Sequence, residues 1–288
     1  MNLFDKLVTE ALINQPNLSP LRAVVEKELL HHDILRILQN NNLMSELTFI
    51  GGTCLRTCYG SLRLSEDLDF TGGKNFSRTS LSKMGQTLVA NLQKKYGLQV
   101  IVSEPVKDKL NVDTWKIKIE TRPEIKNFPA QRINIDICTL SSYEKRPMML
   151  LNPYGIDMGT SGLIIQAQSR EEIFTDKLIA IAFRPNRVKY RDLWDILWLH
   201  SQGIKPRLEL LDKKLKDREK SNDNFLQLFD ERLKYMQDAP SIALDFKHEM
   251  QRFLPLEQIN KVLTQKNLWP FLIYLLNDLG TQIRLCNI

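Results

Sequence analysis

The spacing of apolar residues changes near residue 168, and this change constrains the fold more than any other feature of the sequence. Before it, residues 115–120 (WKIKIE) and 132–138 (RINIDIC) alternate apolar and polar side chains, which is typical of strands with one buried face. After it, apolar residues recur at helical spacing. The sequence therefore predicts an α+β fold, with a mixed sheet and helices in residues 1–168 and a helical C-terminal domain in residues 169–288.

Several elements can be placed within the first region. A helix is expected at 21–39 with Ser19 as its cap, and a second helix at 79–96 that ends at Gly97. In the second region, Ser169 and Glu172 have the spacing of a capping box. Later helices are expected at 189–201, 206–220, 223–237, 241–253, 256–264 and 268–284.

The composition narrows the class of protein. No run of eighteen apolar residues is present, so no transmembrane helix is expected, and the acidic N-terminal stretch does not resemble a signal peptide. A cytoplasmic location without a membrane partner is the default expectation. The cysteines match no zinc pattern, and Cys54 and Cys58 are expected to be buried thiols. The net charge of +6 permits a polyanionic partner, either a nucleic acid or a nucleotide.

Two aspartates lie one residue apart in the stretch 63–73 (RLSEDLDFTGG). If this stretch is extended, Asp67 and Asp69 point to the same side. Neighbouring carboxylates repel each other and are stable when solvated or when a divalent cation lies between them. Taken alone, the stretch is consistent with a polar turn or with a metal site.

The strand 132–138 adds a third carboxylate. Its three isoleucines form an apolar face, and Asp136 lies on the opposite face. A carboxylate in the middle of a strand is costly to bury unless it is paired or bound to metal. Asp67, Asp69 and Asp136 together provide what a two-metal phosphoryl-transfer site requires. Upstream, Gly51 and Gly52 would let a helix N-terminus approach a phosphate, although a plain strand–helix turn explains them equally well.

Ionisable residues in the second region are also unusual. Lys177 lies in an apolar helical stripe, where it either extends to solvent or is held inward as a cation for phosphates. On this basis Lys177→Met should preserve or slightly raise stability. Asp192 and Asp195 share a helix face, where they either complement the helix dipole or belong to a site. Four basic residues precede or flank them: Arg184, Arg187, Lys189 and Arg191.

With these residues in hand, the chain resembles the AbiEii-type toxin family of nucleotidyltransferases, within the polymerase-β-like superfamily. The resemblance covers about residues 45 to 200. It implies a polymerase-β-like mixed sheet followed by a helical domain. It also implies Mg²⁺ as the cofactor, with a two-ion site as one arrangement, and a nucleoside triphosphate (NTP) as the donor. The matching residues are Gly51, Gly52, Thr53, Arg63, Ser65, Asp67, Asp69, Phe70, Asp136, Asp176, Lys177, Leu178, Arg191, Asp192 and Asp195.

The resemblance also implies residue roles. Asp67 and Asp69 would bind metal with Asp136 as the third ligand, and Asp192 or Asp195 would compensate if Asp136 is not a ligand. Lys177 would contact the triphosphate. The remaining nucleotide-binding residues would be Gly51, Gly52, Thr53, Arg63, Ser65 and Arg191.

The implied function is transfer of a nucleoside monophosphate to an RNA, such as the 3′ end of transfer RNA, or to a protein. The protein would be the toxin of a toxin–antitoxin or phage-defence pair, with an antitoxin as partner. One alternative is a D-x-D-x-T phosphatase built on DLDFT, but RLSE replaces the apolar strand that such a site needs. Another is a non-catalytic nucleic-acid-binding protein, although the basic run 213–220 contains acids and is expected to be a solvated helix face.

Overall fold

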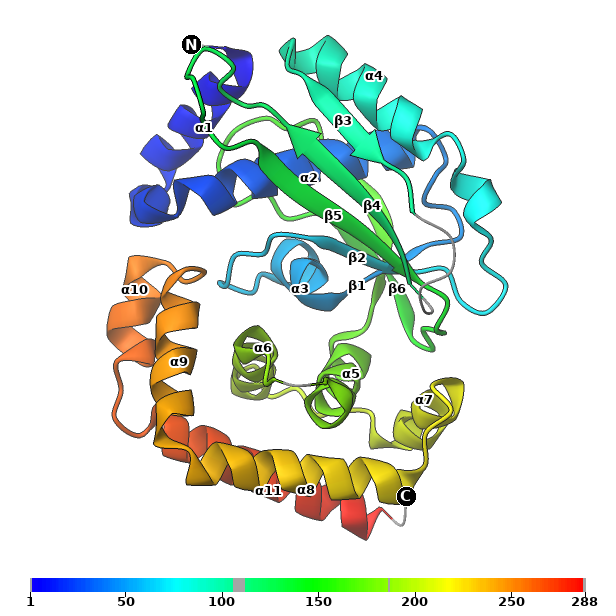
Figure 1. Ribbon diagram of the computed structural model, residues 1–288, viewed down its shortest axis with the longest axis vertical. Helices are drawn as coiled ribbons and strands as arrows, with labels where there is room; N and C mark the ends of the chain where they lie inside the picture. Colours follow the sequence, from blue (N-terminus) through cyan, green and yellow to red (C-terminus); the bar gives the residue numbers. More distant parts are fainter. Residues whose placement is uncertain (1, 106–111, 186, 287–288) are drawn as a thin grey trace. The chain divides into compact units, whose positions relative to one another are not determined.

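The computed structural model describes residues 2–105, 112–185 and 187–286. The chain divides into two compact units, Met1–Gln168 and Ser169–Ile288 (Figure 1). Within the described ranges, no helix has the length and apolar character needed to span a membrane. The first unit carries all the strands of the seven-stranded sheet, and the second is helical, so the α+β class predicted from the sequence is confirmed.

The sheet of the first unit is mixed. Its strand order is β3-β4-β5-β2-β1-β7-β6, in which β2 runs parallel to β5 and β1 runs parallel to β7. The other neighbours are antiparallel. The strands are β1 (Thr48–Ile50), β2 (Leu68–Thr71), β3 (Val100–Ser103), β4 (Val112–Ile119), β5 (Gln131–Cys138), β6 (Lys145–Met149) and β7 (Ile164–Gln168).

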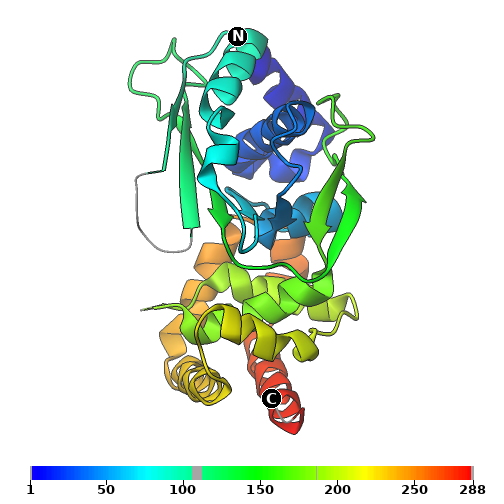
Figure 2. The same ribbon diagram turned by 90° about the vertical axis from the view of Figure 1, so that its right-hand side faces the viewer.

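Helices of the first unit cover the apolar face of this sheet. Figure 2 shows α2 and α4 together against it, and the two helices pack on each other and on β5 and β3 respectively. Gly97 ends α4 in the left-handed conformation, as predicted. The elements are α1 (Leu3–Asn14), the 3₁₀ helix η1 (Pro16–Leu21), α2 (Arg22–Asn40), α3 (Gly51–Tyr59), the 3₁₀ helix η2 (Arg78–Leu81) and α4 (Met84–Tyr96).

Two helix starts in the first unit differ from expectation. Ser19 does not cap α2 but lies inside η1, which begins at Pro16 and continues directly into the α-helix. No extended residue therefore separates the two helices, and an N-cap side chain has no place to act. The helix expected at 79–96 begins instead at Met84, after the 3₁₀ turn of η2. Cys54 and Cys58 are buried free thiols, as predicted.

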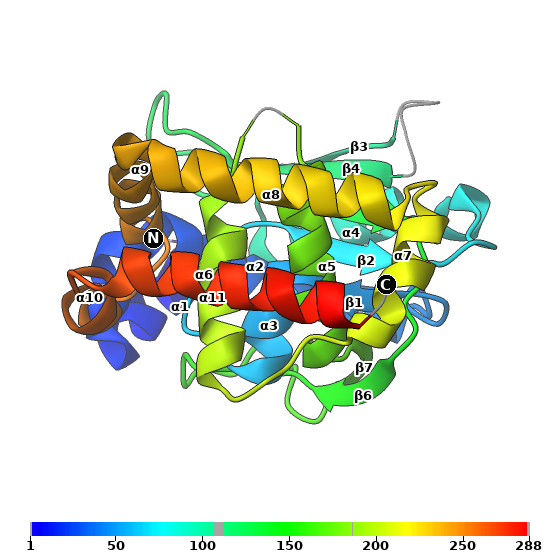
Figure 3. The ribbon, with the colours of Figure 1, turned by 90° about the horizontal axis from the view of Figure 1, so that it is seen from below.

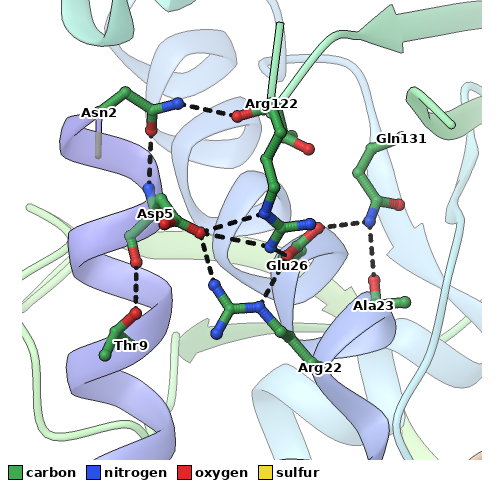
Figure 4. Close-up of polar contacts among 9 residues, drawn as sticks. Asn2, Asp5, Thr9, Arg22, Ala23, Glu26, Arg122 and Gln131 are labelled. Carbon is green, nitrogen blue, oxygen red and sulfur yellow. Dashed lines mark hydrogen bonds and ion pairs between the residues drawn. The ribbon is translucent and has the colours of Figure 1, made fainter. Parts of the chain in front are cut away.

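The helix α2 carries buried ionisable side chains as well as apolar ones. Glu26 accepts hydrogen bonds from Gln131 Nε2 at 2.6 Å and from Arg22 Nε at 3.3 Å, and it also pairs with Arg122 (Figure 4). Asp5 on α1 contacts both arginines. This network ties α1, α2 and the strand β5 together.

The second unit is built from helices whose apolar faces form its core. Ser169 accepts a hydrogen bond from Glu172 N, as the capping pattern predicted. Figure 3 shows α8 and α11 side by side, with α8 also packed on α5. The elements are α5 (Arg170–Phe183), α6 (Tyr190–Ser201), η3 (Leu208–Leu210), α7 (Leu211–Asp217), α8 (Asn222–Asp238), α9 (Pro240–Gln251), α10 (Leu256–Gln258), η4 (Ile259–Leu263) and α11 (Leu268–Leu285).

The basic run 213–220 is not simply a solvated face. Lys214 is 1% exposed, and its ammonium group lies 2.6 Å from Glu172 Oε1 and 2.8 Å from Asp176 Oδ2. Arg218 also pairs with Asp176 at 2.9 Å. The expectation of a solvated face was wrong for this part because two basic residues of the run bind acids of α5.

Candidate active site

Two of the predicted carboxylates are neighbours on the sheet. Asp69 on β2 lies in register with Asp136 on the parallel strand β5. Side chains of paired residues point to the same face, and both carboxylates are half-buried, whereas the alternate residues of both strands are buried. Thr114 on β4, opposite Asp136, donates its hydroxyl to Asp136 Oδ1 at 2.6 Å. The side of the sheet that carries these carboxylates is therefore polar.

Asp67 lies immediately before β2. Its Oδ1 accepts a hydrogen bond from Asn134 N on β5 at 3.0 Å, so this carboxylate is anchored to the strand that carries Asp136. Carboxylate oxygens are the ligands that Mg²⁺ prefers, and this set fits that ion in its chemistry. In the parts of the chain that the structure describes, however, no three His, Cys, Asp or Glu residues form a group that could hold a metal ion. A cation bound by all three aspartates stays a prediction.

The glycine pair brings a helix N-terminus close to Asp69. Gly51 opens α3 with φ +76°, and a Cβ placed there would lie 2.6 Å from Asp69 Oδ2. A Cβ at Gly52 would overlap the guanidinium group of Arg63. The N-cap residue Ile50 provides no side-chain hydrogen bond to the first turn. Glycine is thus required at Gly51, at the N-terminus of α3 beside Asp69.

The other predicted nucleotide-binding residues of the first unit are buried. Thr53 Oγ1 lies 2.7 Å from Ser65 Oγ and also contacts the carbonyl oxygen of Asp67. Arg63 is 3% exposed and donates from Nη1 to the Leu64 carbonyl at 2.9 Å. These contacts stabilise the segment before β2, and a role for these side chains in phosphate binding stays a prediction.

In the second unit, Lys177 is held inward. Its ammonium group lies 2.5 Å from Asp192 Oδ1 and 2.8 Å from Asp195 Oδ2, so it does not extend to solvent. Arg184 adds a contact to Asp192 at 3.1 Å. Burial raises the pKa of Asp192, but Lys177, Lys189 and Arg184 more than offset this and hold that pKa well below its usual range. The structure therefore joins Lys177, Asp192 and Asp195 into one buried ionic cluster.

Arg191 contacts residues at the C-terminal end of α9. Its guanidinium group lies over the ring of Phe253, with Cζ 4.7 Å from the ring centroid, and its Nε is 3.9 Å from Glu249 Oε1. Glu249 lies in the last turn of α9, and Phe253 lies just after this helix. A nucleotide-binding role for Arg191 stays a prediction.

The chain is similar to solved structures at low sequence identity. JHP933 from Helicobacter pylori has a TM-score of 0.48 and 19% identity, covering 92% of this chain and 96% of that one. A second H. pylori protein, provisionally described as a nucleotidyltransferase, has a TM-score of 0.40 and 20% identity, covering 90% and 94%. No curated protein matches the chain.

A family model decides the identity. The model described as "Nucleotidyl transferase AbiEii toxin, Type IV TA system" matches residues 33–271, well over half of the chain. The chain belongs to the AbiEii family. It is a nucleotidyltransferase, and this assignment favours nucleotidyl transfer over both alternatives, the D-x-D-x-T phosphatase and the non-catalytic nucleic-acid-binding protein. The matched range includes every site residue considered above.

One group of buried residues near the site lies outside the AbiEii sequence motifs and was not predicted from the sequence. Glu28 and His31 on α2 are 2% and 0% exposed and contact the segment that leads into β2. The stretch EKELLHHD, residues 26–33, places ionisable residues on several sides of a helix in a chain that has only four histidines. That pattern indicates buried polar contacts, although it does not identify the partners.

Proposed function

We propose that the protein is a metal-dependent enzyme that transfers a nucleoside monophosphate from an NTP to an RNA hydroxyl, such as that at the 3′ end of transfer RNA. The observation that supports this most is the in-register pair Asp69 and Asp136 beside the N-terminus of α3. An anionic triphosphate needs both a cation to offset its charge and backbone donors for its oxygens. This arrangement provides residues for each.

The reaction requires one bond to form and one to break. The acceptor hydroxyl oxygen attacks the α-phosphorus and forms a new phosphoester bond. The bond from that phosphorus to the oxygen bridging to the β-phosphate breaks, pyrophosphate leaves with the electron pair, and the hydroxyl proton passes to solvent. Magnesium, when bound, would neutralise phosphate charge and favour ionisation of the attacking hydroxyl.

The residues of the first unit would orient this reaction. Asp69 and Asp136 would bind the cation, and Asp67 would contribute the oxygen that does not accept from Asn134. Because Gly51 has no side chain, a phosphate oxygen can approach the first-turn N–H groups of α3. Gly51 also leaves room for the carboxylate of Asp69, which a Cβ would displace.

Lys177 would contact the triphosphate, as the family resemblance implies. Asp192 and Asp195 fix its ammonium group between them, so little side-chain freedom would be lost when a phosphate binds. Asp192 and Asp195 would accordingly position the lysine. They would not themselves be metal ligands, because each already neutralises a cation of the protein.

The acceptor and the partners are also part of the proposal. The AbiEii family is one of type IV toxin–antitoxin systems, so we place the protein as the toxin of such a pair, with an antitoxin protein in the same system and phage defence as its setting. Expression of the wild-type protein should then arrest growth. Asp69→Asn at equal protein level should not.

The deciding experiment uses each of the four NTPs, labelled at the α-phosphate, with Mg²⁺ and total RNA. Wild-type protein should label an RNA band with at least one NTP, and chelation of the metal should abolish labelling. Label on a protein band would replace RNA by a protein acceptor. Labelling that persists after chelation would contradict the metal-dependent mechanism.

A further inference from the structure

Side chains of other elements contact the segment that leads into β2, residues 61–67. We call it the lead-in segment; it contains Ser65 and Asp67. Ser65 N–H donates to Glu28 Oε1 at 3.0 Å. The Glu66 carbonyl lies 3.0 Å from His31 Nε2, and the Asp67 carbonyl contacts the hydroxyl of Thr53. The conformation of this segment therefore depends on residues distant in the sequence.

Glu28 connects three parts of the first unit. Besides Ser65 N–H, its carboxylate accepts from Arg56 Nε at 3.1 Å and from the hydroxyl of Tyr154. Arg56 in turn donates from Nη1 to the carbonyl of Ser61, at the start of the lead-in segment. Glu28 is 2% exposed, so each of these charge-assisted hydrogen bonds forms in a site of low dielectric constant.

His31 and Lys27 continue this face of α2. Because a carbonyl oxygen only accepts, His31 must donate from Nε2 to Glu66, which fixes its tautomer. Lys27 Nζ lies 2.7 Å from the side chain of Glu66. Lys27 and His31 are four residues apart, and Glu28 lies three residues before His31, so all three share one side of the helix.

We propose that Lys27, Glu28 and His31 are positioning residues that hold the lead-in segment so that Asp67 and Asp69 keep the geometry needed to bind the catalytic cation. This inference rests on the proposed function. The segment ends at Asp67, and Asp69 follows two residues later on β2. A shift of the segment at Ser65 or Glu66 moves Asp67 directly, and metal ligands tolerate little displacement.

Glu26 provides a matched control on the same helix. It is 1% exposed and has three polar partners, as Glu28 does, but these partners are Arg22, Arg122 and Gln131 (Figure 4). None of them belongs to the lead-in segment. Replacement of either glutamate by glutamine keeps the side-chain size, removes a buried charge and should destabilise the first unit. Only Glu28→Gln should alter the site.

The experiment compares Glu28→Gln with Glu26→Gln under conditions in which both are folded. Mn²⁺ binding, followed by electron paramagnetic resonance, should weaken by about 10- to 100-fold in Glu28→Gln and stay near the wild-type value in Glu26→Gln. Nucleotidyl transfer should show the same split, mainly in kcat. Hydrogen exchange of peptides covering residues 61–70 should be faster only in Glu28→Gln.

A second pair of variants keeps the test valid if Glu28→Gln does not fold. His31→Leu removes the donor to Glu66, whereas His31→Gln can supply an amide N–H near the Nε2 position. Exchange of residues 61–70 and Mn²⁺ affinity should change in His31→Leu and be restored in His31→Gln. Restoration of the site by the amide distinguishes hydrogen bonding from simple packing of the imidazole ring.

The outcomes separate this inference from the proposed function. If the wild-type protein transfers nucleotide and Glu28→Gln and His31→Leu bind Mn²⁺ and react normally, the positioning role is overturned and the proposed function stands. Equal losses in Glu28→Gln and Glu26→Gln overturn it as well, because they show a general stability effect. A wild-type protein that neither binds Mn²⁺ nor transfers nucleotide overturns both.

Discussion

The replacement Lys177→Met tests how the ionic cluster of the second unit works. The sequence alone predicts that this change preserves the apolar stripe of α5 and therefore stability. The structure predicts the opposite, because the ammonium group contacts two carboxylates, of which Asp195 is 0% exposed and Asp192 is 3% exposed. Methionine matches the stem of lysine but leaves these charges without their common partner.

The size of the effect follows from burial. Removal of one partner of a buried ion pair costs about 3–5 kcal/mol because an uncompensated charge remains. Arg184, 3.1 Å from Asp192, continues to neutralise one carboxylate, so we expect a loss near the lower end of that range. With a urea dependence of about 2 kcal/mol per M, the unfolding midpoint should fall by roughly 1.5 M.

Lys214→Met is the matched control. Lys214 also lies between two carboxylates, Glu172 and Asp176, with an arginine remaining on one of them. Unfolding can be followed by tryptophan fluorescence, since Trp194, Trp198 and Trp269, three of the four tryptophans, belong to residues 169–288. Both variants should be destabilised by similar amounts. At low temperature and without urea, where both are folded, only Lys177→Met should lose nucleotidyl transfer.

Two results would refute this reasoning. A Lys177→Met protein as stable as the wild type would show that the buried pairing contributes nothing, and that the apolar stripe alone decides stability. Equal loss of activity in folded Lys177→Met and Lys214→Met would show that Lys177 has no role in the reaction beyond stabilising the second unit.

Three further predictions concern other parts of the molecule. Gly51→Ala should abolish most activity because φ is +76° and the new Cβ would displace Asp69. Gly162→Ala, with φ +75° and open space, should lose only the stability that the backbone strain costs, about 1–2 kcal/mol, and keep normal activity; equal activities would contradict this. Burial lowers the pKa of His32 to about 4, so as the pH falls the unfolded chain binds a proton before the folded chain does. The contribution of neutral His32 to stability is present in full above about pH 6.5, and the free energy of unfolding should fall by roughly 2 kcal/mol by pH 5. His32→Asn should reduce this fall in urea denaturation, and an unchanged fall would exclude His32 as its source. Replacement of Arg187 by glutamine should flatten the salt dependence of RNA binding, with Arg184 and Lys189 left intact because both stabilise the ionised form of Asp192. An unchanged slope would exclude an RNA role for Arg187.

Local sequence patterns predicted the elements and part of the site. The alternation in residues 132–138 correctly placed Asp136 on the face opposite the isoleucines, because side-chain direction in a strand follows from position alone. Gly97 and Ser169 were likewise placed correctly as helix ends, since both act through contacts within a few residues. The Ser19 cap was wrong because Pro16 starts a 3₁₀ turn that merges with the next helix.

Long-range partners could not be read from the sequence. The apolar stripe of α5 left two fates for Lys177, and the choice depended on a pair of acids 15 and 18 residues away, on α6. Glu28 meets Ser65 only because α2 packs beside the lead-in segment. The register that sets Asp69 against Asp136 depends on two strands that are far apart in the chain. Such contacts are properties of the tertiary fold.

The central claim is that Asp69 and Asp136 form the catalytic pair, and one comparison of rates tests it most directly. Asp136→Asn should be measured against Asp113→Asn, since Asp113 on β4 pairs with Ile137 on the opposite, apolar side and forms an ion pair with Arg78 at 3.1 Å. We predict that Asp136→Asn lowers the rate of Mg²⁺-dependent nucleotidyl transfer by at least about 100-fold, as loss of a metal ligand should, while Asp113→Asn remains near the wild-type rate. Near-normal transfer by a folded Asp136→Asn protein would contradict the account.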